Sequence, residues 1–488
     1  MDPAFNHFSC LCERLRRNDP YTTQIMNPDS EFMHLFLNED TSYLLGEALL
    51  GNNHVTDLRL NFGAHSEDPD DYPHTLWNSI SSCKSVKRVE FSGPILSSDF
   101  THRLLGSIAR KKALERVLLY DMALGANSLS LLLRGSGRFM TTFCLKNCKL
   151  VVRNQLEIQK AVMSFHDHPY LLSFHVQIFP SVFKLLQGLV SHPILQELII
   201  DGVMYEHRRE YIDPVIPMNY VFALICAIVE SPRSVLQHLQ LQNFDFKSEE
   251  APFAGLVKST MVNQTLTKLS FVGNCKFHTS PVQHLVSIFQ NHESSIRSLG
   301  VHQSCTIIRH LPQILENKIP NLKELDVSCY ISLDHSVVRL LGGDMALECY
   351  KLTRLSERAC ETLIQVLPFV QKVKYLTVGF VGAFQHLRAA LLRALEKNSS
   401  LVEAVFFYDD NIDDEEDYFS ENQDDFFSVI QLNKILLYTQ RNDRLPQMLL
   451  ESPSSELTLS ILPHLFCSTH RLQMGIGLIL RSLLKLRK

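Results

Sequence analysis

The feature that most constrains this chain is a short apolar pattern that returns along most of its length. In QTLTKLSFVGNC, residues 264–275, Leu266, Leu269 and Phe271 stand at offsets 0, 3 and 5. This spacing fits neither the 3.6-residue period of a helix nor the sustained alternation of a strand. The pattern occurs thirteen times, and its offset-3 residues, here called markers, are Leu58, Val89, Val117, Phe143, Phe174, Leu198, Leu239, Leu269, Leu299, Leu325, Tyr350, Leu376 and Ala404.

The distance between successive markers is nearly constant. It ranges from 24 to 31 residues, except for one interval of 41 residues. A fixed period of this size indicates one supersecondary unit repeated in a stack. The second half of each unit reads as a helix: Ser280 can cap one, and Pro281 fits its first position. An apolar stripe with helical spacing then follows at Val282, Leu285, Val286 and Phe289.

The pattern LxxLxLxxN/C, with a period near 28, resembles the leucine-rich repeat in its long, ribonuclease-inhibitor-like form. The resemblance covers residues 51–408. It implies an α/β solenoid, a horseshoe with parallel strands on the concave face and helices on the convex face. At offset 8 only Cys148 and Asn274 carry the Asn or Cys of that family. We therefore expect most of the loop-closing hydrogen-bond ladder to be missing.

The regions flanking the array complete the expected domain organisation. We predict a helical N-terminal cap at residues 1–50, about 13 repeats at 51–408, an acidic linker at 409–427 and a helical C-terminal cap at 428–488. The linker holds ten carboxylates and no Lys or Arg, and it lacks the Gly of a calcium-binding loop. It is either a solvated connection or a contact for a basic partner. The basic amphipathic end of the chain is either a cap or a contact site.

Composition excludes several classes of protein. The formal net charge of −5 gives no electrostatic argument for nucleic acid, so no nucleic-acid ligand is expected. The longest apolar run, residues 220–229, is about half of what spans a bilayer, so no transmembrane segment is predicted. Twelve cysteines without a secretory signal indicate reduced thiols and the cytoplasm, with the nucleus left open. The sequons at Asn263 and Asn398 are then chance matches.

No local motif for catalysis or metal binding occurs. HExxH, GxxxxGK[ST] and GxSxG are absent from the sequence. The pairs Cys10/Cys12, His166/His168 and Cys144/Cys148 have no second pair at zinc-site spacing. We predict no metal, no cofactor and no catalytic residues, and hence no enzyme.

The residues that alternate with the buried ones should face outward at offsets 2, 4 and 6. The middle of this surface is rich in His and Gln, and the partner-binding residues predicted there are His175, Gln177, His238, Gln240, Gln242, Lys268 and His302. The 41-residue interval adds an insertion with side-chain types common at interfaces, namely Tyr205, Arg208, Arg209 and Tyr211. The alternative for this insertion is a tolerated surface loop.

The resemblance implies a non-enzymatic protein–protein interaction scaffold that binds a protein or peptide partner on its concave face. One alternative is an activator of a small GTPase, since GTPase-activating leucine-rich-repeat proteins also place an acidic stretch after the array. Another is a substrate receptor of a ubiquitin ligase, and a third is a hydrolase whose residues meet only in space.

Overall fold

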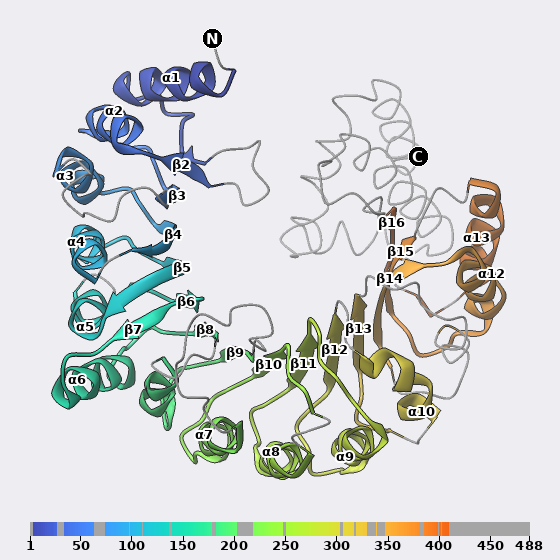
Figure 1. Cartoon of the computed structure of the whole chain (residues 1–488). Coiled ribbons are helices and arrows are strands. Elements are labelled where there is room, and N and C mark those ends of the chain that lie inside the picture. The colour runs from blue at the N-terminus through green and yellow to red at the C-terminus, as the bar shows by residue number, and fades with distance from the viewer. Residues whose placement is uncertain are drawn as a thin grey trace, which may run out of the picture. The chain divides into compact units, whose positions relative to one another are not determined.

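The computed structural model (Figure 1) describes residues 3–26, 34–62, 74–96, 98–109, 111–135, 139–177, 182–202, 218–246, 250–302, 306–316, 319–328, 338, 347–380, 385–398, 400–401 and 403–408. The predicted acidic linker, the C-terminal cap and the four insertion residues lie outside these ranges. The chain forms two compact units, residues 1–326 and 327–488.

In the first unit, parallel strands stand side by side in chain order, with helices outside them (Figure 1). The order is β1 (Gln24–Ile25), β3 (Asp57–Phe62), β4 (Arg88–Leu96), β5 (Arg116–Gly125), β6 (Thr142–Lys146), β8 (Ser173–Gln177), β9 (Glu197–Asp201), β10 (His238–Gln242), β11 (Lys268–Val272), β12 (Ser298–His302) and β13 (Glu324–Ser328). Two short strands lie off this row: β2 (Leu35–Leu37) pairs with β3, and β7 (Lys149–Val151) with β5.

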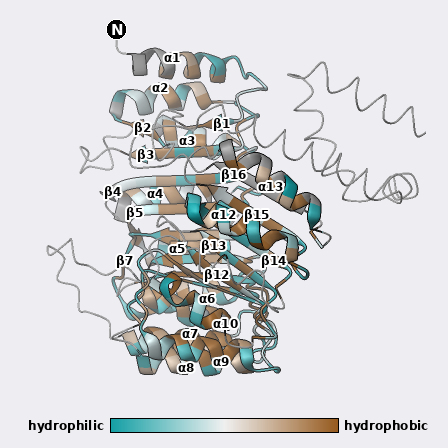
Figure 2. Cartoon of the chain, turned by 90° about the vertical axis from the view of Figure 1, so that its right-hand side faces the viewer, coloured by the Kyte–Doolittle hydropathy of each residue, from teal (hydrophilic) through white to brown (hydrophobic). Residues whose placement is uncertain are grey.

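The helices of this unit follow the strands in the chain. They are α1 (Pro3–Arg16), α2 (Glu39–Leu49), α3 (His74–Ser82), α4 (Ser98–Ile108), α5 (Ala126–Arg134), α6 (Gln155–His166), the 3₁₀ helix Phe183–Leu189, α7 (Met218–Glu230), α8 (Glu250–Val262), α9 (Thr279–Gln290), the 3₁₀ helix Thr306–His310 and α10 (Leu311–Glu316). Helices such as α6 and α8 carry hydrophobic and hydrophilic residues side by side (Figure 2), as expected when one helix face covers a sheet.

The second unit has the same organisation on a smaller scale. Its parallel strands are β14 (Cys349–Leu355), β15 (Tyr375–Phe380) and β16 (Glu403–Tyr408). Helix α12 (Glu357–Val366), the 3₁₀ helix Leu367–Phe369 and α13 (Gln385–Lys397) alternate with them. Ser356 caps α12 by accepting a hydrogen bond from the Ala359 amide, as its position in the sequence predicts.

Strand register confirms the repeat predicted from spacing. Each marker lies opposite the next in the pairs Leu58–Val89, Val89–Val117, Val117–Phe143, Phe143–Phe174, Phe174–Leu198, Leu198–Leu239, Leu239–Leu269, Leu269–Leu299, Tyr350–Leu376 and Leu376–Ala404. All these markers are at most 2% exposed, since each points into the layer between strands and helices. The fold is therefore an α/β leucine-rich-repeat solenoid.

The loop-closing residue at offset 8 needs one correction. Cys148 is buried there, and its thiol donates to the Leu119 carbonyl of the preceding repeat at 3.3 Å. Asn274, in contrast, is exposed, and the next residue, Cys275, is buried and donates to the Leu241 carbonyl at 3.5 Å. Gly273, two residues before Cys275, has a left-handed φ of +70°, a conformation that glycine adopts at little cost.

A second ladder, which we did not predict, lies three residues before each repeat's first apolar residue. Buried polar side chains occupy this position in several repeats, namely Asn52, Cys83, Lys111, His168, His192, Asn263 and Asn398. The Asn263 amide donates to the Val229 carbonyl at 2.6 Å. The Asn398 amide donates to two carbonyls of the preceding turn in the same way. The two sequon asparagines are thus internal hydrogen-bonding residues of the repeats.

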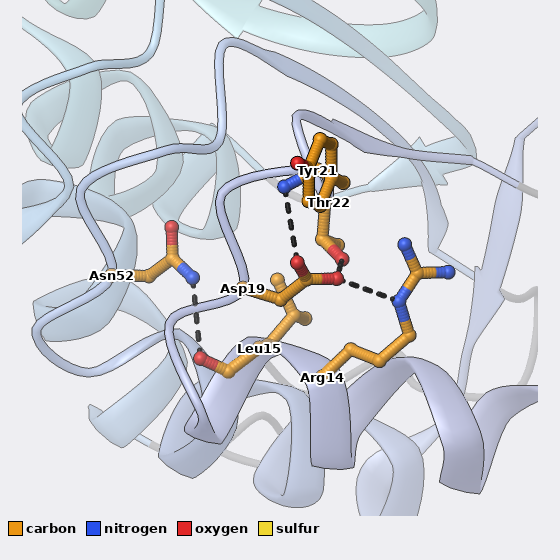
Figure 3. Close-up of polar contacts among 6 residues, drawn as sticks. All are labelled: Arg14, Leu15, Asp19, Tyr21, Thr22 and Asn52. Atoms are coloured by element: carbon orange, nitrogen blue, oxygen red, sulfur yellow. Dashed lines mark hydrogen bonds and ion pairs between the residues drawn. The ribbon is translucent and has the colours of Figure 1, made fainter.

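The same ladder joins the N-terminal segment to the array. Asn52 donates to the Leu15 carbonyl, at the end of α1, at 3.2 Å (Figure 3). The turn after α1 is closed by the Asp19 carboxylate, which accepts hydrogen bonds from Thr22 at 2.7 Å and Arg14 at 2.9 Å. These bonds lower the pKa of Asp19, with the Thr22 hydroxyl as the largest cause.

Candidate functional site on the strand face

The strand face is the side of the first unit's sheet that points away from the helices. Strand alternation places on it seven of the predicted partner-binding residues: His175 and Gln177 on β8, His238, Gln240 and Gln242 on β10, Lys268 on β11, and His302 on β12. The other four, Tyr205, Arg208, Arg209 and Tyr211, lie outside the described residues and stay a prediction.

His238 lies at the centre of a polar cluster on this face. Its Nδ1 is 2.9 Å from Glu197 Oε1, and its Nε2 is 3.0 Å from Ser270 Oγ. Ser173 donates to the second oxygen of Glu197 at 2.5 Å. The hydrogen bond from His238 is the largest cause that lowers the pKa of Glu197, which falls to about 2. Glu197 is therefore ionised at neutral pH.

Gly300 allows the cluster to continue onto β12. A Cβ atom built on Gly300 would lie 2.5 Å from Ser270 Oγ and 2.9 Å from His302 Nε2, so both side chains use the space that glycine leaves. His302 Nδ1 lies 3.9 Å from Asp326 Oδ1 on β13. One side chain from each of six neighbouring strands thus forms what we call the strand-face network: Ser173, Glu197, His238, Ser270, His302 and Asp326.

Sequence reasoning included only His238 and His302 of this network among the binding residues. Ser173, Glu197, Ser270 and Asp326 stand at offsets 2 and 4, so the repeat alignment assigned them to this face. Their connection depends on which strands are neighbours and on the space at Gly300. Aligning the repeats by offset would have placed Glu197 and His238 directly opposite each other.

Two of the predicted residues are more enclosed than expected. His175 Nδ1 lies 3.4 Å from Cys144 Sγ, and burial lowers the pKa of His175 to about 4 and raises that of Cys144 to about 12. Both side chains are therefore neutral at pH 7. Gln177 is 3% exposed, and its Oε1 accepts the Asn147 amide at 2.5 Å, which closes the turn after β6.

The order Ser270–His238–Glu197 resembles a serine hydrolase triad in its connectivity. Ser270, however, is 1% exposed, which leaves no room for a carbonyl substrate at its hydroxyl. Strand β11 pairs with β10 and β12 on both sides, so its amides are committed to the sheet and not to an oxyanion. The geometry favours recognition of a ligand over covalent catalysis.

Two further findings apply to the described ranges only. Within them, no group of three or more His, Cys, Asp or Glu side chains is arranged to hold a metal ion. None of the helices in the described part of the chain is both long enough and apolar enough to cross a membrane.

Comparisons with known proteins give little beyond the fold. No protein-family model and no curated protein matches the chain. Among solved structures, the crystal structure of the TLR13–ssRNA13 complex is similar at 13% sequence identity and a TM-score of 0.29. The match covers 77% of this chain and 65% of that one, so this chain spans less than two thirds of its length.

This comparison corrects one prediction. We excluded nucleic acid because the net charge is only −5, whereas the similar structure holds single-stranded RNA. The exclusion was wrong because net charge sums over the whole chain and does not describe how charge is distributed on one face. Nucleic acid is thereby reopened as a class of ligand, but no ligand is assigned to this chain, because the TM-score of the match is 0.29.

Proposed function

We propose that the protein is a non-enzymatic scaffold that binds a protein or peptide partner across its strand face. The observation that supports this proposal is the strand-face network, which presents polar groups on neighbouring strands of one open surface. Its ionisable side chains are partly exposed: 37% for Glu197, 18% for His238, 21% for His302 and 14% for Asp326. A partner can contact them without opening the core.

The ribonuclease-inhibitor-like form of the repeat is part of this proposal. The helices that follow most strands support it, since the long repeat carries one helix per strand. We also propose that the protein resides in the cytoplasm or the nucleus, because its described cysteines are free thiols. Cys83, Cys148 and Cys275 act as reduced, buried hydrogen-bond donors to backbone carbonyls, a role that favours a reducing compartment.

The proposal is tested by cross-linking and capture from cell extract. The variant carries His238→Ala, Gln240→Ala and Gln242→Ala on β10. The matched control carries His292→Ala, Gln159→Ala and Gln283→Ala, which are exposed residues of the same types away from this face. We expect the control to retain the partners of the unmodified protein and the β10 variant to lose them.

Retention of every partner by the β10 variant would contradict binding on the strand face. Extract treated with nuclease before capture separates a protein partner from a nucleic acid, because only the latter is lost. Recovery of a small GTPase or a ubiquitin-ligase adaptor would favour one of the alternative functions.

A further inference from the structure

Charge is unevenly distributed over the strand face. In the first part, strands β3 to β6, the outward positions hold four basic residues and two acidic ones, for a sum of +2: Arg59, Arg88, Arg116, Lys146, Asp57 and Glu90. In the second part, strands β9 to β13, they hold one basic residue and four acidic ones, for a sum of −3: Lys268, Glu197, Asp201, Glu324 and Asp326. The net charge of the whole chain conceals this division.

The basic part is not neutralised by its own carboxylates. Asp57 lies 3.5 Å from Arg88, and Glu90 lies 3.7 Å from Arg59. His34 is a further neighbour of Glu90, at 3.4 Å. Both carboxylates therefore already have basic neighbours. Arg116 and Lys146 are exposed on the same surface and add positive charge beyond these pairs.

The acidic part keeps its negative charge for a different reason. Two of its carboxylates accept hydrogen bonds from neutral groups: Ser173 donates to Glu197, which also lies beside His238, and the Asn243 amide donates to Asp201 at 2.8 Å. Such hydrogen bonds stabilise an ionised carboxylate without cancelling its charge. The pKa of Glu197 is lowered first by its hydrogen bond with His238 and then by that from Ser173, so this carboxylate stays ionised.

A further observation on the acidic part points to a ligand. Ser298, on β12 beside Lys268 of β11, is 5% exposed, and its Oγ has no hydrogen-bond partner among the described residues. Its offset places it on the strand face. A buried hydroxyl without a partner is costly, so a polar group of a bound ligand would satisfy it.

We infer that the partner is a polypeptide with separate acidic and basic segments, the acidic one lying over β3–β6 and the basic one over β9–β13. This inference rests on the proposed function, because it assumes binding on the strand face. Segregated charge on one surface favours a partner with complementary segregation and fixes its direction. Nine strand steps of about 4.8 Å separate β3 from β13, so an extended segment of about 13 residues would span the face.

The test compares two synthetic peptides of about 16 residues with identical composition. In the block peptide, Glu alternates with Ser in one half and Lys with Ser in the other. In the mixed peptide, the same Glu, Lys and Ser residues are arranged so that Glu-Ser and Lys-Ser pairs alternate throughout. Because net charge and composition match, only the charge pattern differs. We expect the full-length protein to bind the block peptide about tenfold more tightly at low salt, measured by fluorescence anisotropy, and the difference to shrink at high salt.

Charge reversal locates the effect on the protein. Arg116→Glu with Lys146→Glu should remove the preference for the block peptide. The control Lys160→Glu with Lys258→Glu makes the same change in net charge on exposed positions of helices α6 and α8 and should keep the preference within about twofold. Circular dichroism confirms that both variants are folded.

Equal binding of the two peptides by the unmodified protein would overturn this inference. An equal loss of the preference for the block peptide in both charge-reversal variants would also overturn it. The proposed function is judged separately, by capture with the β10 variant. If that variant loses its partners while the peptides bind equally, binding on the strand face stands and the charge-segregated partner is wrong. If the variant keeps its partners, the proposed function itself fails.

Discussion

At the scale of single residues, the position three before each strand's first apolar residue is the most informative. It holds a buried polar side chain in seven of the described repeats, from residues as different as Asn52, Lys111 and His192. Asn52 and Lys111 share a donor that reaches a backbone carbonyl: the Lys111 ammonium lies 2.5 Å from the Cys83 carbonyl. Burial lowers the pKa of Lys111 to about 8.

His192, at the same position of its repeat, makes the stability of the protein depend on pH. Burial, followed by repulsion from His168 and His166, lowers its pKa from 6.5 to about 4. Between these two pH values the unfolded chain binds more protons than the folded one, so stability must fall as the pH falls from 6.5 to 4. We expect this contribution to reach about 3 kcal/mol at most, and His192→Asn to remove it.

Urea unfolding at several pH values checks this prediction. His292→Asn is the control, because His292 is exposed and is not among the groups that lower the pKa of His192. The prediction fails if His192→Asn and the unmodified protein lose stability equally between pH 6.5 and 4. Glu197 affects stability at lower pH. Its pKa of about 2 in the folded protein lies below its ordinary value of 4.5. Its contribution to the free energy of unfolding is therefore lost as the pH falls from 4.5 to 2.

At the scale of elements, the turn that ends each strand has a recurrent backbone conformation. Five residues at offset 7 have positive φ: Asp121, Asn147, Asn243, Gly273 and Arg354. Four of them are Asp, Asn or Gly, the types that adopt this conformation at least cost. Asn147, Asn243 and Gly273 directly follow the last residues of β6, β10 and β11, where the chain turns toward the helix, whereas Asp121 and Arg354 lie within β5 and β14.

Asn147 tests this role of the turn. We expect Asn147→Val to destabilise the protein by about 1–2 kcal/mol, because a β-branched side chain is strained at φ of +54°. Asn147→Gly should be tolerated, since it keeps the amide that Gln177 accepts and relieves the strain. Thermal unfolding of both variants measures the difference. Equal stability of the two would show that the turn does not require this conformation.

At the scale of the whole molecule, the rate at which each free thiol is alkylated shows whether the repeats are packed against one another. Cys10 is exposed, whereas Cys83, Cys148 and Cys275 are buried in three separate repeats. Burial raises the pKa of the Cys148 thiol, which suppresses the reactive thiolate. We expect iodoacetamide to modify Cys10 rapidly in the native protein and the three buried thiols only after denaturant is added. Peptide mass spectrometry assigns each site, and rapid native modification of Cys148 would contradict the packed repeats.

Much of the fold could be predicted from the sequence, because in a repeat array residues at the same offset of successive repeats lie opposite each other in the sheet. The markers predicted from spacing alone lie opposite one another in the sheet, for example Leu198 opposite Leu239 despite the 41-residue interval between them. The rule failed at Asn274, where one extra residue in a turn moved the buried position to Cys275. The repeat pattern assigns this buried residue to one fixed offset, so it misplaces the residue where the turn is one residue longer.

The sequence by itself determined the period, the buried residues and the face on which polar side chains emerge, because apolar residues must be buried wherever they recur. Only the tertiary structure decided which of those polar side chains meet. The contact of His238 with Glu197 and Ser270 joins residues 41 and 32 positions away along the chain. It forms because stacking sets three strands side by side, a relation between repeats that no single repeat contains.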